Sequence, residues 1–354
     1  MRRVDPPNDI TRTSADPSTD ARRHTVADRP GTTRPSDDLR QRLDHLPAGH
    51  PSSPYETDGR RREPGSRLRD LETEFDETRP LTDTEWPEHR TDVRAELASV
   101  DDSGLETDHL HTVDEDRKIW TVERNRIQGE LVADLYGEAK DVPCSGRAII
   151  AGGLPGSGKS TILSEQAGID LSKYLTINPD EIKEKMAERG MIPHVEGLSP
   201  MEASHLAHEE SSLIAKRLAL RAVADRKNVI WDITMSSRGS TVERIAQLRD
   251  AGYAVEGIFV DIPVETSIRR ADARHRKGHD EYRAGIGLGG RYVPPEAIEA
   301  QANPVWGSNN REAFENVKHL LQPWRRYDNS VDDRDAVLSA DSLANDQDRE
   351  ETSQ

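Results

Sequence analysis

The sequence has 354 residues, a formal net charge of −17 and a single cysteine, Cys144. So acidic a chain repels a phosphodiester backbone, which argues against a general nucleic-acid-binding protein. One cysteine allows no disulfide framework and suits a reducing compartment, and no apolar run approaches the ~18 residues needed to span a bilayer. We therefore expect a cytoplasmic protein without a membrane partner.

The chain begins with a long stretch rich in proline and charged residues. Nine of the 21 prolines lie in the first 70 residues, and neither Phe nor Trp occurs before Phe75. Such a stretch has no apolar period and buries too little apolar surface to offset the entropy of ordering it. We expect a disordered, acidic and proline-rich leader over residues 1–110, either a solvated linker or a docking arm. One domain over residues 111–340 and a disordered acidic tail over residues 341–354 complete the expected organisation.

Helix and strand signals alternate from residue 117 onward. Apolar residues at roughly helical spacing predict an amphipathic helix over residues 117–140. Short apolar runs predict strands over residues 148–151, 174–177, 228–232 and 254–262, with a last short strand near 324–328. Helices fit between them over residues 160–167, 180–189, 200–225, 240–250 and 264–276. This order predicts an α/β fold in which helices cover both faces of a parallel sheet. The segment 277–304, rich in Gly and Arg, is typical of a mobile substrate cover.

The turn between the first predicted strand and the helix after it carries a phosphate-binding motif. Residues 153–161 match the P-loop pattern G-x-x-x-x-G-K-[ST]; they are Gly153, Leu154, Pro155, Gly156, Ser157, Gly158, Lys159, Ser160 and Thr161. A strand that leads through such a turn into a helix aims backbone N–H groups and the helix dipole at phosphates. We expect this loop to bind ATP, with Lys159 at the β- and γ-phosphates and Ser160 on Mg²⁺.

Two aspartates follow predicted strands at the edge where open α/β sheets bind ligands. Asp180 comes after the second strand and begins a helix, a position that suits a base for a substrate hydroxyl. A plain helix N-cap is the alternative reading. Asp232 ends the third strand and could bind Mg²⁺ directly or through water, or be an ordinary polar strand end.

Arginines gather around the expected cover. They are Arg269, Arg270, Arg274, Arg276 and Arg291, and Arg238 follows the third strand. The guanidinium group binds phosphate oxygens through two donors and stays charged, so these side chains are candidates for the transferring phosphate. Most arginines of any chain are solvated surface residues, and that reading stays open for each of them.

Several motifs in residues 115–335 resemble the zeta toxins, P-loop kinases of bacterial toxin–antitoxin systems. Besides the P-loop, they are Asn-Pro-Asp-Glu-Ile-Lys (178–183), His-Glu-Glu-Ser-Ser (208–212), Asp-Ile-Thr (232–234) and Gly-Gly-Arg-Tyr-Val-Pro (289–294). The resemblance implies a P-loop kinase fold that uses ATP and Mg²⁺. It implies that Asp180 is the general base, that Lys159, Arg274 and Arg291 bind the transferring phosphate, and that Glu210, Asp232 and Thr234 contact the substrate. Arg238 stands two positions after the corresponding substrate arginine.

The reaction implied by this resemblance is phosphorylation of the 3′-hydroxyl of the N-acetylglucosamine in UDP-N-acetylglucosamine. Its partners would be the nucleotide-sugar substrate and an antitoxin protein. Two alternatives stay open: a P-loop kinase of another small metabolite or of a polynucleotide, and a nucleotide-regulated switch without phosphoryl transfer.

Overall fold

The computed structural model describes residues 78–101, 103–114 and 118–342. The chain divides into two units, Met1–Gly65 and Ser66–Gln354. The first unit lies outside the described residues, and so do the leader up to residue 77 and the tail from residue 343. All described residues therefore belong to the second unit.

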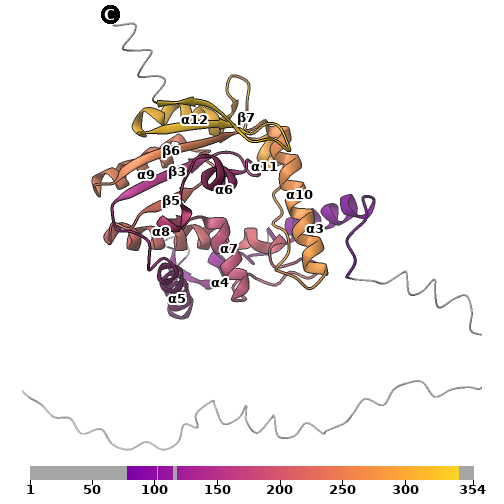
Figure 1. Ribbon diagram of the computed structural model, residues 1–354. Coiled ribbons are helices and arrows are strands. Elements are labelled where there is room, and N and C mark those ends of the chain that lie inside the picture. The colour runs from indigo at the N-terminus through magenta and orange to yellow at the C-terminus, as the bar shows by residue number, and fades with distance from the viewer. Residues whose placement is uncertain (1–77, 102, 115–117, 343–354) are drawn as a thin grey trace, which may run out of the picture. The chain divides into compact units, whose positions relative to one another are not determined.

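A six-stranded sheet forms the centre of this unit, in the order β10-β9-β6-β3-β5-β4 (Figure 1). The five parallel strands are β3 (Arg147–Gly152), β4 (Leu175–Ile177), β5 (Val229–Asp232), β6 (Ala254–Asp261) and β9 (Trp324–Asp328). The predicted α/β fold and its strands are thereby confirmed. We did not predict the sixth strand, β10 (Val337–Asp341), which pairs antiparallel with β9.

Both faces of the sheet are covered, as near-continuous apolar strands require. Ala148 and Ile150 of β3 pack with residues of α5 (Val122–Glu138), α7 (Pro179–Glu188), α8 (His208–Ala224), α9 (Arg238–Asp250) and α12 (Asn309–Val317). Ile149 and Ala151 point to the other face, because successive strand residues alternate. There they meet Ile162 and Leu163, which follow the short α6 (Lys159–Thr161) in a π-helical turn, Ile162–Gln166.

Helix starts follow local capping signals. The Asn178 side chain accepts a hydrogen bond from the backbone N–H of Asp180, with Pro179 in the first turn of α7. Thr121 caps α5 in the same way, so this helix begins at Val122, later than predicted. The residues before it form a hairpin of β1 (Thr112–Asp114) and β2 (Ile119–Trp120).

Other helices differ from the prediction in length. The long helix predicted over residues 200–225 is a 3₁₀ turn, Glu202–Ala207, followed by α8. Helix α10 (Val264–Arg283) runs seven residues past its predicted end at residue 276, into the segment expected to be a cover. The rest of that segment is a loop, α11 (Pro295–Glu299) and the first strand of the β7–β8 hairpin (Ala302–Asn303, Gly307–Ser308). Among the described residues, no helix is long and apolar enough to cross a membrane.

The expectation of a disordered leader is wrong for residues 78–101 and 103–110. They include α3 (Glu85–Asp101) and α4 (Thr107–His111), and α3 lies beside α10 (Figure 1). Buried Val93, Leu97 and Val100 of α3 pack on Val195, Leu198, Ala203 and Leu206. A sparse apolar stripe at helical spacing was enough for folding because a tertiary partner covers it, which a composition average over the leader conceals.

Candidate functional site

The P-loop follows β3 at the carboxyl end of the sheet and leads directly into α6. Gly153 has a φ of +144°, and a Cβ on it would collide with the Val260 carbonyl oxygen, so only glycine fits there. Gly158 caps α6 in the left-handed conformation, with a φ of +83°. The first N–H groups of any helix have no partner within that helix, and here they line the loop.

The side chains of the loop are arranged to receive phosphate and cation. Lys159 Nζ donates to the Gly153 carbonyl oxygen (3.3 Å) and lies 3.5 Å from Asp232 Oδ1. Ser157 Oγ is buried and has no hydrogen-bond partner within the described residues. Ser160 and Thr161 are exposed on α6. The N–H groups at the helix start, the Lys159 cation with Asp232 beside it and the exposed Ser160 hydroxyl are groups that fit ATP and Mg²⁺.

A chain of polar contacts links this loop to Asp180. Asp232 Oδ1 faces Lys159, and its Oδ2 accepts a hydrogen bond from Asn178 Nδ2 at 3.2 Å. Asn178 Oδ1 in turn accepts one from the Asp180 backbone N–H at 2.9 Å. Asn178 therefore caps α7 and orients Asp232, which leaves the Asp180 side chain available for another role.

The Asp180 carboxylate pairs with two cations. Arg291 Nη1 forms an ion pair with its Oδ1, and Lys183 Nζ lies 3.5 Å from the same atom. Burial lowers the pKa of Arg291 to about 10 and that of Lys183 to about 8. Both groups therefore remain mostly cationic at neutral pH, Lys183 by the smaller margin.

Two glycines place Arg291 against Asp180. A Cβ on Gly290 would collide with the backbone carbonyl of His275 in α10, and a Cβ on Gly289 would collide with Ser199. The Gly-Gly-Arg segment can therefore lie flat on α10. The motif is explained by this close approach of two backbones.

The structure brings together some of the other predicted residues. Arg274 of α10 is exposed and close enough to Asp232 and Glu184 to feel their charges. Thr234 is exposed after β5, and its carbonyl accepts from the Gly153 N–H (3.4 Å) and from Asn310 Nδ2 (2.7 Å). Arg238 is the first residue of α9 and is exposed, and within the described chain no hydrogen bond or ion pair joins it to this network.

The expected contact of Glu210 with substrate is contradicted. Glu210 is fully buried in α8, and both of its oxygens accept from the Arg124 guanidinium at 2.7 Å. Gln128 Nε2 donates to the same carboxylate at 2.6 Å. A buried carboxylate of this kind must be paired, and the acceptors of Glu210 are occupied by α5. Glu210 fastens α5 to α8.

Sequence analysis missed several residues of this site. Asn178 and Lys183 belong to one of the family motifs but had no predicted role, although their positions beside Asp180 could have suggested one. Asn329 comes from after β9; its Nδ2 donates to the Ser157 carbonyl at 2.8 Å. Arg270, one of the predicted arginine candidates, donates to the Asn329 carbonyl at 2.9 Å and to Asp332. These two residues border a cavity of about 500 Å³ beside Gly158 and Thr161, and no short-range pattern predicts it.

Comparison with known proteins finds one matching family and several similar structures. The model of the family described as Zeta toxin matches residues 137–329, more than half of the chain. A comparison with curated proteins finds no match. Among solved structures, AvrRxo1-ORF1:AvrRxo1-ORF2 with sulphate ions is similar at 19% identity and a TM-score of 0.48, over 63% of this chain and 68% of that one. The PezAT toxin–antitoxin system of Streptococcus pneumoniae is similar at 16% identity and a TM-score of 0.46, over 63% and 82%.

Proposed function

This chain belongs to the zeta toxin family, and on that premise we propose that it is an ATP-dependent kinase of a nucleotide-sugar hydroxyl. The acceptor we propose is the 3′-hydroxyl of the N-acetylglucosamine in UDP-N-acetylglucosamine. The matched residues include the P-loop, Asp180, Asp232 and Arg291. We propose further that the protein acts as a toxin and that an antitoxin protein is its partner.

One observation supports phosphoryl transfer over a nucleotide switch. The contacts from Lys159 through Asp232 and Asn178 to Asp180 join a phosphate-binding loop to a carboxylate beside it. A nucleotide switch needs the loop but has no need for a carboxylate held next to it and paired with an arginine. A kinase needs both, because it must place the γ-phosphate and deprotonate the acceptor in one site.

The reaction assigns a task to each side chain. The acceptor oxygen forms a bond to the γ-phosphorus as the bond from that phosphorus to the β,γ-bridging oxygen breaks, and ADP leaves. Asp180 takes the proton of the acceptor hydroxyl. Lys159, Arg274 and Arg291 offset the charge on the phosphoryl oxygens. Ser160 and Asp232 would hold Mg²⁺, which neutralises phosphate charge when it is bound.

We place the acceptor near the end of β5. Thr234 offers an exposed hydroxyl there, and Arg238 begins α9 a few residues later. In our proposal Asp232 and Thr234 contact the sugar, and Arg238 reaches a substrate phosphate from the rim. Glu210 has no part in this wall because Arg124 and Gln128 occupy its carboxylate.

The experiment is incubation of the full chain with ATP, Mg²⁺ and a panel of nucleotide sugars, small alcohols and oligonucleotides, read by mass spectrometry. We expect one added phosphate on UDP-N-acetylglucosamine and none with Lys159→Ala. Transfer only to a small alcohol or an oligonucleotide would overturn the substrate and keep the kinase. ATP binding without transfer to any acceptor would support the switch.

A further inference from the structure

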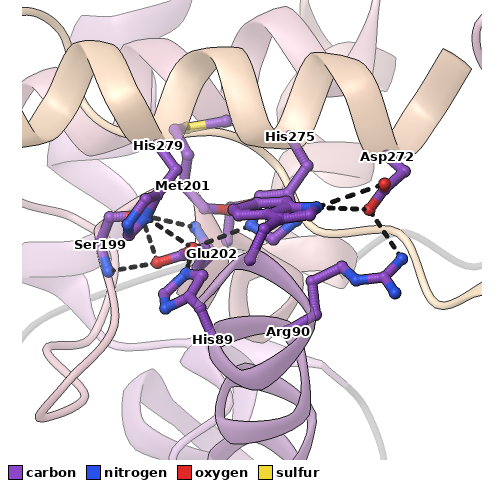
Figure 2. Close-up of polar contacts among 10 residues, drawn as sticks. His89, Arg90, Ser199, Met201, Glu202, Asp272, His275 and His279 are labelled. Carbon is purple, nitrogen blue, oxygen red and sulfur yellow. Dashed lines mark hydrogen bonds and ion pairs between the residues drawn. The ribbon is translucent and has the colours of Figure 1, made fainter. Parts of the chain in front are cut away.

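Away from the P-loop, four side chains converge in the interior where α3 meets α10. They are His89 of α3, Glu202 of the 3₁₀ turn, and His275 and His279 of α10, all directed toward one point (Figure 2). Glu202 Oε1 lies 2.7 Å from His89 Nε2, 2.8 Å from His275 Nε2 and 3.2 Å from His279 Nδ1. Three imidazole nitrogens thus face a single carboxylate oxygen.

The surroundings of the cluster hold it rigid and dry. Glu202, His275 and His279 are buried, and only His89 is partly exposed. Glu202 Oε2 accepts hydrogen bonds of 2.8 Å from both the N–H and the hydroxyl of Ser199, which fixes the carboxylate plane. The buried ring of Trp86 packs on His275 and His279, with centroids 4.7 and 5.8 Å away.

We propose that this cluster is a binding site for Zn²⁺, with His89, Glu202, His275 and His279 as its ligands. Imidazole nitrogen and carboxylate oxygen are ligands that zinc takes, in a tetrahedral set of four. The donor atoms of His89, Glu202 and His275 all lie within 4.8 Å of one another.

The ligand atoms of His89, Glu202 and His275 need little change to admit the ion, whereas the His279 ring must turn farther because it falls outside the group within 4.8 Å. Ligands at about 2.0–2.1 Å around a tetrahedral centre lie roughly 3.3 Å from each other. The three nitrogen–oxygen separations of 2.7, 2.8 and 3.2 Å would therefore open by about 0.6 Å at most. Side-chain rotation supplies that much movement without displacing a helix.

Two further features favour a metal over hydrogen bonding alone. His275 and His279 are four residues apart on one helix, the spacing at which paired histidines of helical zinc sites share a face. Three donors on one oxygen also crowd an atom that commonly accepts two.

Four protein ligands leave no open position, so the role we assign to this ion is structural. It would tie α3 to α10 at the base of the phosphate-binding arginines. Arg274 is the residue before His275, and Gly290, which places Arg291, lies against the His275 carbonyl. By fixing His275, the bound ion would therefore restrain the backbone that positions both Arg274 and Arg291.

The test uses the untagged full chain, stripped with a chelator and dialysed against Zn²⁺. Bound zinc is measured by elemental mass spectrometry, and Co²⁺ is added as a probe whose visible absorption reports four-coordinate geometry. We compare His89→Gln and His275→Gln with His194→Gln, a control on an exposed loop residue. Circular dichroism verifies folding, and if His275→Gln does not fold, His89→Gln at the rim decides.

We expect one Zn²⁺ per chain in the wild type and in His194→Gln. The two ligand variants would lose affinity by more than the about 100-fold that outer-shell changes cost. A wild type that retains no zinc would overturn the proposal, and so would zinc that stays bound equally in His89→Gln. Tetrahedral Co²⁺ absorption lost in both variants would support it independently of kinase activity.

Discussion

The Arg291 guanidinium forms an ion pair with the Asp180 carboxylate, across the gap between the loop after α10 and the start of α7. In our proposal these groups have different tasks, since one binds a phosphate and the other takes a proton. An incoming acceptor must therefore separate them. This ion pair balances the negative charge of Asp180 beside the phosphate-binding loop while no substrate is bound.

Asp180→Asn tests the base. Asparagine keeps the size of the side chain but cannot take the acceptor proton. A general base contributes about 10²–10⁴ in rate, so we expect transfer to fall by that factor and ATP affinity to stay within about twofold. Rates from mass spectrometry and affinity from calorimetry measure the two effects. Glu188→Gln, at the exposed end of the same helix, is the control; an Asn variant as fast as this control would refute the assignment.

Arg291→Gln tests the cation. It removes a charge that we assign to the transferring phosphate, so we expect kcat to fall about 10²–10³-fold, as when one transition-state donor is lost. The Kd for ATP would change much less. Arg249→Gln on the exposed face of α9 serves as the matched control. A rise in kcat would mean that the ion pair restrains Asp180 and that phosphate binding lies elsewhere.

Gly290→Ala tests how Arg291 is positioned. A Cβ there collides with the His275 carbonyl, so the loop must move off α10 and carry Arg291 with it. We expect kinase activity to drop at least tenfold and the protein to be destabilised by about 1–3 kcal/mol, the usual cost of overpacking. Gly129→Ala in α5 is the comparison, because nothing lies within 4 Å of its Cβ; it should be neutral or stabilising. Equal behaviour of the two variants would contradict the close-approach argument.

Leu97→Ala tests whether α3 belongs to the folded unit. Leu97 is 8% exposed and packs on the segment before α8. Truncation of a buried leucine costs about 2–5 kcal/mol, whereas Leu220→Ala, at 70% exposure on α8, should stay within about 0.5 kcal/mol. Urea unfolding measures both. A Leu97 variant as stable as the Leu220 variant would show that α3 contributes nothing to the fold.

From the lowered pKa of Lys183 we predict that the folding stability of the protein depends on pH. Burial lowers its pKa from 10.5 to about 8, so the unfolded chain holds this proton more tightly than the folded one. The loss of folding stability caused by burying the charged amine is fully present below about pH 8 and fades as the pH rises toward 10.5. Lys183→Met should therefore stabilise the protein at pH 7 by up to a few kcal/mol, an advantage that shrinks over this window.

The control for this prediction is Lys185→Met, a partly exposed lysine of the same helix α7. Its stability difference from the wild type should not shrink in the same window. Denaturant midpoints at pH 7, 8, 9 and 10 give the comparison. A constant advantage of Lys183→Met across these values would mean that the buried amine carries no proton penalty.

Local sequence determined the elements that carry the chemistry. The P-loop, the strand before it and the Asn-Pro-Asp start of α7 are short-range patterns whose geometry follows from glycine, capping and strand sterics. Strands that alternate with helices leave few topologies besides a covered parallel sheet. The family resemblance and the candidate residues rest on the same local patterns.

Tertiary structure alone decided the rest. The orientation of Glu210 depends on its partners in α5, a helix far away in sequence. Its ion pair with Arg124 of α5 holds the carboxylate in the interior, away from substrate. Leader residues 78–101 and 103–110 fold because the segment before α8 covers an apolar stripe too sparse to predict a helix by itself, and α10 adds polar contacts. The histidine cluster likewise exists only where α3 meets α10. Each depends on burial and pairing between distant segments, which are properties of packing that no window of neighbouring residues contains.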